Sequence, residues 1–170
     1  MNDKYNILIV DDDGVLCSVL REGLLAFEFP CKTAMSGKTA LELLANNPFE
    51  VMVTDITMPG MNGFELTKKA KQLKPDLAAI VMTGFEDEGS YNHAIAAGAA
   101  DFIKKPFTMA ELLVRIDRIM RDSKLLAAIQ QREQDMKSIS REMIAGVQDE
   151  SSKRIADFEQ EVANLKKKLS

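Results

Sequence analysis

The stretch from Val51 to Gly63, VMVTDITMPGMNG, limits what this chain can fold into more than any other. Its first four residues are apolar or β-branched, which is typical of a strand buried on both faces. Asp55 follows directly, and the proline and glycines after it indicate a loop. Open α/β folds bind ligands at the carboxyl ends of their parallel strands. We therefore predict that Asp55 is the reactive group of the protein.

Strand patterns and helix patterns alternate along the first two thirds of the chain. The expected strands span residues 5–10, 29–34, 51–54, 77–82 and 101–104. Ser36, Asn62 and the pair Thr108 and Glu111 are expected to cap helices, and a short helix is expected over residues 90–97. This alternation predicts an α/β fold with a doubly wound, five-stranded parallel sheet. The flavodoxin-like strand order 2-1-3-4-5 suits five such units.

Composition narrows the class of protein. The chain has 170 residues, 46% of them hydrophobic, which is enough for one ordinary domain and an additional segment. A formal net charge of -4 gives no general attraction to nucleic acid or anionic lipid. No apolar run approaches a membrane span, and the N-terminus lacks the apolar region of a signal peptide. We expect a cytoplasmic protein that binds neither nucleic acid nor membrane, with Cys17 and Cys31 as buried thiols.

Polar side chains collect at the predicted carboxyl ends of the strands. Asp11 and Asp12 follow the first strand and Asp55 follows the third, so three carboxylates converge where these strands are neighbours. The three groups cannot all stay ionised at close range without a counter-charge. A Mg²⁺ ion with oxygen ligands supplies one. Thr83 after the fourth strand and Lys105 after the fifth add a hydroxyl and a cation.

These groups together suit phosphoryl transfer to a carboxylate. In this interpretation Asp55 is the nucleophile and phosphoacceptor. Lys105 pairs with the new phosphoryl oxygens, and Thr83 donates a hydrogen bond to one of them. The expected ligands of the Mg²⁺ are Asp11, Asp12, Asp55 and the backbone carbonyl of Thr57.

Four segments resemble the receiver domain of bacterial two-component response regulators. They are ILIVDDD at the first strand, VTDITMPGMNG around Asp55, VMTG at Thr83 and KKPF at Lys105. The resemblance covers about residues 4–122. It implies the roles given above for the matching residues, and a sensor histidine kinase or phosphotransfer protein as the phosphoryl donor. We expect a self-phosphorylating receiver and not an enzyme, because no separate catalytic output domain is seen in the sequence.

Three residues near the predicted site distinguish this chain from the common family pattern. Phe102 stands at the family's switch aromatic on the fifth strand, and as phenylalanine it has no hydroxyl to form a hydrogen bond. Gly84 stands where alanine is common, and a glycine loosens a loop. Phe85 is bulky and apolar, and we expect it to hinder attacking water and to lengthen the lifetime of the aspartyl phosphate.

A second family offers an alternative nucleophile. The segment Asp11-Asp12-Asp13-Gly14-Val15 also fits the DxDG opening of haloacid-dehalogenase-type phosphohydrolases, in which Asp11 would be the reactive group. This alternative leaves the loop at residues 58–63 unexplained. The sequence also has no acidic pair after Lys105 to complete that family's metal site.

The last third of the chain has a different pattern, because only Gly146 interrupts it after Pro106. We predict a receiver domain over residues 1–122 and a helical extension over residues 123–170. An apolar stripe with 3-4 spacing, joined at Ser151 by a stutter, favours a coiled coil. The stripe comprises Ile129, Met136, Met143, Val147, Ile155, Phe158, Val162, Leu165 and Leu169. The alternatives are a solvated or frayed helix and a helical hairpin near residues 146–152.

The stripe favours a homodimer through the C-terminal helix, whose pairing or register responds to phosphorylation. Two kinds of output remain open. In one, the chain is an adaptor whose partner is a downstream signalling protein. In the other, it is the receiver-plus-linker part of a longer regulator with an enzymatic output domain. A stop codon directly after Ser170 in the gene would separate these two hypotheses.

Overall fold

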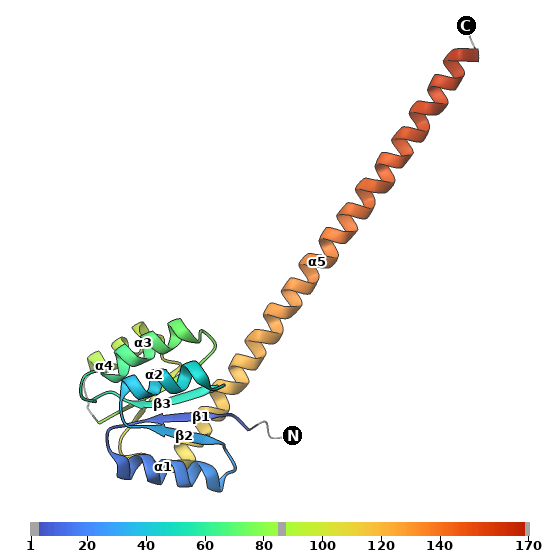
Figure 1. Ribbon diagram of the computed structural model, residues 1–170. Helices are drawn as coiled ribbons and strands as arrows, with labels where there is room; N and C mark the ends of the chain where they lie inside the picture. The colour runs from blue at the N-terminus through green and yellow to red at the C-terminus, as the bar shows by residue number, and fades with distance from the viewer. Residues whose placement is uncertain (1–3, 85–87, 169–170) are drawn as a thin grey trace. The chain divides into compact units, whose positions relative to one another are not determined.

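A computed structural model describes residues 4–84 and 88–168 of the chain, and its strands form one parallel sheet (Figure 1). The strands are β1 (Ile7–Val10), β2 (Cys31–Ala34), β3 (Val51–Asp55), β4 (Ala78–Thr83) and β5 (Asp101–Lys104). The helices are α1 (Gly14–Ala26), α2 (Gly37–Asn46), α3 (Gly63–Leu73), α4 (Glu88–Ala96) and α5 (Met109–Lys168). The sheet order is β2-β1-β3-β4-β5, which confirms the predicted doubly wound architecture.

Helices cover both faces of the sheet, because successive strand residues point to opposite faces. Ile7 and Ile9 of β1 pack with α1 and the first turns of α5. Leu8 and Val10 of the same strand pack with α2 and α3. Figure 1 shows α1 on one side of the strands and α2 and α3 on the other. A strand enclosed in this way must be apolar along its whole length, and all four residues of β1 are buried.

The first two strands are shorter than the sequence predicts. The prediction that β2 begins at Phe29 is wrong, because the N–H of Phe29 donates to the carbonyl of Leu24 at the end of α1. Glu28 has a φ of 63° in that turn, and Pro30 has no N–H for a ladder. β2 therefore starts at Cys31, and β1 starts at its register partner, Ile7.

β5 has the predicted boundaries, those of β3 and β4 lie within one residue of the predictions, and those of α4 lie within two. β4 runs one residue further than expected, to Thr83, and α4 spans Glu88–Ala96 rather than residues 90–97. The helix caps are confirmed: Ser36 accepts from the N–H of Thr39, and Asn62 accepts from the N–H of Glu65. Phe85, to which we assigned an effect on the aspartyl-phosphate lifetime, lies outside the described residues.

The chain divides into two compact units, Met1–Asp122 and Ser123–Ser170. In the second unit α5 continues to Lys168, which confirms the predicted long helix and rules out the alternative of a helical hairpin near residues 146–152. A glycine inside a helix costs only about 1 kcal/mol relative to alanine, which a long helix tolerates. Leu169 of the predicted stripe lies outside the described residues. Among the helices that the structure describes, none combines the length and the apolar content needed to cross a membrane.

The two cysteines differ in their surroundings. Cys17 is buried, as expected, whereas Cys31 at the start of β2 is only partly buried. The difference follows from position, because Cys17 lies on the face of α1 that packs against the sheet and β2 is an edge strand. The expectation of two buried thiols is thus correct for Cys17 alone.

Candidate functional site

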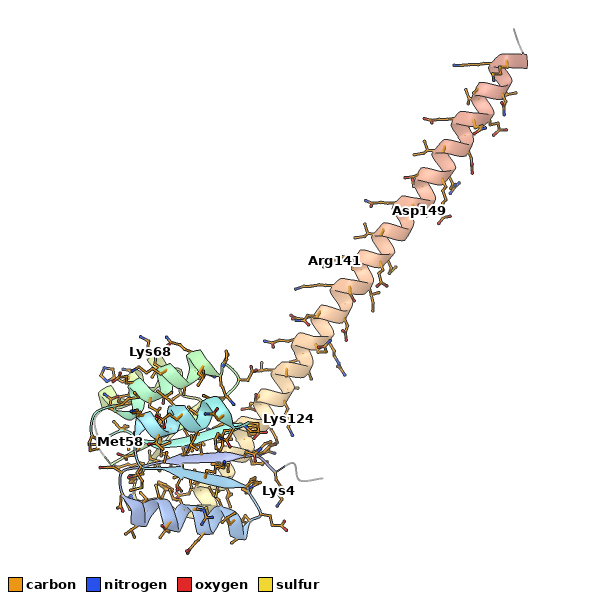
Figure 2. All side chains as sticks on the ribbon, in the orientation of Figure 1. Lys4, Met58, Lys68, Lys124, Arg141 and Asp149 are labelled. Atoms are coloured by element: carbon orange, nitrogen blue, oxygen red, sulfur yellow. The ribbon has the colours of Figure 1, made fainter. Side chains whose placement is uncertain are left out.

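The sheet brings two aspartates from neighbouring strands to one edge. Val10 at the end of β1 is in register with Thr54 of β3, so Asp11 and Asp55 follow at the same level. Both residues are buried, with exposed fractions of 2% and 7%. Figure 2 labels Met58 in the loop after β3, at the end of the sheet toward which the strand arrows of Figure 1 point.

The lysine that directly follows β5 lies against both aspartates. The Nζ of Lys105 is 2.8 Å from Asp11 Oδ2 and 2.7 Å from Asp55 Oδ1. Burial on its own would lower the pKa of Lys105, but its hydrogen bonds to Asp11 and Asp55 and the charges of both carboxylates outweigh burial and raise the pKa above its ordinary value. The ammonium group therefore stays charged at neutral pH and partly neutralises two acids.

Backbone amides hold the second oxygen of each carboxylate. The N–H of Asp13 donates to Asp11 Oδ1 at 2.9 Å, and the N–H of Thr57 donates to Asp55 Oδ2 at 2.7 Å. Each carboxylate is thus bonded to Lys105 through one oxygen and to the main chain through the other. These contacts fix the direction of each side chain.

The acids fit a hard divalent cation. Asp11, Asp12 and Asp55 each offer one oxygen, and these atoms lie within 4.8 Å of one another. Asp12 is exposed whereas the other two are buried, so the group opens toward solvent. Carboxylate oxygens on a solvent-facing edge are the ligands that Mg²⁺ prefers, since it keeps several waters. The residues present therefore fit the expected Mg²⁺ in number, chemistry and access.

Thr83 and Lys105 are placed by β4 and β5. Asp55 is in register with Met82, so Thr83 lies one residue beyond Asp55 on the adjacent strand. Thr83 is 5% exposed, and its carbonyl accepts the backbone N–H of Lys105 at 2.6 Å. The segment around Asp55 is thus connected through β4 to the segment that carries the lysine.

Phe102, the expected switch aromatic, lies on β5 in register with Val81 of β4 and is partly buried. Its neighbour Asp101 accepts hydrogen bonds through Oδ2 from Arg115 and Arg118 of α5, at 2.8 and 2.6 Å. The Oδ1 of Asp101 accepts the N–H of Phe102 at 2.9 Å. The sequence analysis did not predict these ion pairs between β5 and the receiver part of α5, because the spacing of Arg115 and Arg118 does not indicate which acid they bind.

The sequence analysis interpreted Gly63 only as a residue that indicates a loop. Its N–H donates to the carbonyl of Ile56 at 2.9 Å, and a Cβ added to it would lie 2.1 Å from the carbonyl oxygen of Asp55. Only glycine permits this approach of the first turn of α3 to the backbone of Asp55. The signal in the sequence was a glycine directly after the cap residue Asn62.

Cys17 and Asp13 support the site without being part of its chemistry. The Sγ of Cys17 is 3.4 Å from the carbonyl oxygen of Asp11. Burial, and then the negative charge of Asp11, raise the pKa of the Cys17 thiol, so it remains protonated. Asp13 caps α1 by accepting from the N–H groups of Val15 and Leu16. In the described structure Asp13 is thus a helix cap, which is also a sufficient reason for a third aspartate after β1.

Comparison with known proteins agrees with this geometry. Residues 7–117 match the family model of the response regulator receiver domain, and the chain belongs to that family. Among curated proteins, the response regulator SaeR of Staphylococcus aureus strain USA300 is 35% identical over 115 residues, covering 68% of this chain and 50% of SaeR. The chain thus spans about half the length of the curated relatives it matches.

Solved structures give the same family. A CheY-like receiver domain protein from Methanospirillum hungatei JF-1 is 29% identical, with a TM-score of 0.69 over 72% of this chain and 98% of that one. A structure described as adenylate cyclase from Rhodopirellula baltica is 31% identical, with a TM-score of 0.68 over 75% of this chain and 96% of that one. The expected resemblance to a response regulator receiver domain is confirmed.

Proposed function

We propose that this response regulator accepts a phosphoryl group on Asp55 from a sensor histidine kinase or a phosphotransfer protein. The observation that supports this most strongly is the Lys105 ammonium, which lies 2.7 Å from Asp55 and 2.8 Å from Asp11 at a solvent-facing edge of the sheet. A buried carboxylate beside a fixed cation and an open acidic group is arranged for nucleophilic attack on phosphorus.

In the transfer, an oxygen of Asp55 attacks the phosphorus of the donor's phosphohistidine. The new O–P bond forms as the P–N bond breaks, and the electron pair leaves with the imidazole. Mg²⁺ bound by Asp11, Asp12, Asp55 and the carbonyl of Thr57 would neutralise charge on the phosphoryl oxygens. The backbone N–H of Thr57 orients Asp55, and the Lys105 ammonium moves its hydrogen bond from the Asp55 carboxylate to a phosphoryl oxygen.

The switch follows from the same groups. The hydroxyl of Thr83 turns to donate to a phosphoryl oxygen, and Phe102 takes the space that Thr83 leaves. Phe102 lies beside Asp101, the residue that Arg115 and Arg118 bind, so a change at β5 reaches the receiver part of α5. Phosphorylation thereby shifts the population between two surfaces of the receiver, and pairing of the tail helix as a homodimer carries the signal.

The length of the relatives favours one form of output. This chain covers only half of SaeR, and its relative from Rhodopirellula baltica is described as an adenylate cyclase. Both observations favour a receiver joined to a further output domain over an adaptor that binds a separate signalling protein. In either form the receiver acts by accepting the phosphoryl group on Asp55.

The test is phosphoryl uptake from acetyl phosphate in the presence of Mg²⁺, measured by intact mass. We expect the wild type and Asp122→Asn, a matched change outside the site, to gain one phosphoryl group, and Asp55→Asn to gain none. Borohydride reduction followed by peptide mapping would then locate the acyl phosphate. A label on Asp11 would support the phosphohydrolase alternative instead, and full uptake by Asp55→Asn would refute the proposal.

A further inference from the structure

Exposed apolar side chains on the tail helix recur every eleven residues. Leu125, Met136, Val147 and Phe158 are 62%, 70%, 66% and 67% exposed, and all four lie on the continuous helix α5. Eleven residues make three turns at about 3.67 residues per turn, close to the natural period of an α-helix. The four side chains therefore form one nearly straight line along the second unit of the chain.

Positions beside this line repeat with the same period. One neighbouring row holds Ile129, Ser140, Ser151 and Val162, and the row on the other side holds Arg132, Met143, Arg154 and Leu165. Further out lie Ile139 on one margin and Ile144 and Ile155 on the other, and all three are exposed. The line and its flanks thus account for almost all the exposed apolar residues of this segment.

A seven-residue frame describes the same segment less well. It would put Ile129, Met136 and Met143 on one line, and Leu126, Glu133, Ser140 and Val147 on the other, where two of the four are polar. The eleven-residue frame moves Glu133 from the centre of the stripe to its margin. The eleven-residue repeat also explains the stutter at Ser151, because a heptad followed by four inserted residues is one eleven-residue repeat.

We propose that residues 125–165 pair with the same segment of a second copy of this chain as a parallel, in-register coiled coil with an eleven-residue repeat. This inference rests on the proposed function, in which the tail forms a dimer, and it specifies the geometry of that dimer. The two helices form a nearly straight, slightly right-handed pair in which Val147 and Phe158 face their counterparts. The helix is unbroken at Gly146 and Ser151, so the stripe is continuous through this region.

Charge complementarity supports a second copy as the partner. In a parallel, in-register pair, a residue on one margin of the contact faces the residue five positions later on the opposite margin of the other helix. This rule joins Glu161 to Lys166 and Ile139 to Ile144, each contact occurring twice by symmetry. It brings no two like charges together among the margin residues from 128 to 166, whereas Arg132 and Arg154 of the flanking row each lie near their own counterparts.

Two adjacent leucines test the repeat. Leu125 and Leu126 are 62% and 60% exposed, but only Leu125 lies on the proposed line. Analytical ultracentrifugation of the full chain, with and without Mg²⁺ and beryllofluoride, gives the dimer dissociation constant. We expect Leu125→Asn to raise it about tenfold or more, and Leu126→Asn to raise it less than about threefold. The opposite ranking would support the seven-residue frame, and a monomer in all conditions would overturn the pairing.

Cysteine cross-linking tests the orientation. In a background without Cys17 and Cys31, Phe158→Cys should form a disulfide-linked dimer under copper–phenanthroline oxidation, whereas Ala156→Cys, on the back of the helix, should not. A mixture of Met136→Cys and Phe158→Cys chains that cross-links to each other in preference to themselves would show an antiparallel pair and overturn the inference. Phosphoryl uptake by every variant is measured in parallel. Uptake without pairing refutes this inference alone, and pairing without uptake refutes the proposed function alone.

Discussion

Replacement of Gly63 by alanine tests how the loop after β3 positions Asp55. The added Cβ would lie 2.1 Å from the carbonyl oxygen of Asp55, 2.9 Å from its carbonyl carbon and 3.0 Å from the Cα of Ile56. All three are backbone atoms, so no side-chain rotation can relieve the contact. Because non-bonded carbon contacts are optimal at about 3.5–4.0 Å, the backbone of Asp55 and the first turn of α3 must separate by about 1 Å.

The size of the effect follows from that displacement. Overpacking of this kind typically costs about 1–3 kcal/mol, and we expect Gly63→Ala to lower the free energy of unfolding by that amount. The shift also moves the Asp55 carboxylate relative to Lys105, to which it is bonded at 2.7 Å. Since a misplacement of about 1 Å can slow a positioned reaction up to about a hundredfold, the rate of phosphoryl uptake from acetyl phosphate should fall as well.

Urea unfolding followed by tyrosine fluorescence measures the stability of the receiver. Tyr5 packs against Phe29, with ring centroids 6.4 Å apart, and so reports on this unit. Gly84→Ala is the matched control: Gly84 is exposed, and among the described residues nothing lies within 4 Å of an added Cβ. We expect the control to stay within about 0.5 kcal/mol of the wild type. Equal stability and equal uptake rates for the two variants would refute the argument.

Two further predictions concern charge and capping. The pKa of Lys105 is raised in the folded state, so its stabilisation is fully present below the unfolded pKa of about 10.4 and lost as pH rises through the higher folded value. Unfolding curves above pH ~10.4 should show this loss in the wild type, and an identical decline in Lys105→Met would contradict it. Thr108→Ala removes the hydroxyl that accepts the N–H of Glu111 at 3.2 Å, and we expect a loss of about 1 kcal/mol at pH 7, with Ser123→Ala as the unaffected control. The hydrogen bond from the backbone N–H of Thr108 lowers the pKa of Glu111. The stabilisation of the cap by this carboxylate is therefore present above the unfolded pKa of Glu111 and is lost as pH falls through the lower folded pKa. A Thr108→Ala penalty that grows in acid would contradict this assignment.

The sequence by itself determined the fold class and the place of Asp55 at the end of a buried strand. Strands enclosed between two helical layers must be largely apolar, and the apolar runs at residues 7–10 and 51–53 show this without any tertiary information. The alternation of such runs with helices leaves few topologies, and the acids that end β1 and β3 then converge. Caps such as Ser36 and Thr108 were equally visible, because a capping interaction spans only three residues.

Only the tertiary structure decided which groups meet. Lys105 bonds to Asp11 across 94 residues of sequence, and that pairing depends on the register of the strands between them. The need for glycine at position 63 arises from the approach of α3 to the backbone of Asp55, a distance that no local pattern encodes. The start of β2 was misplaced because Phe29 bonds back to α1, where a turn competed with a strand of the same composition. Local patterns are set by backbone propensity and burial, whereas these contacts depend on how distant segments pack, and that information exists only in the folded chain.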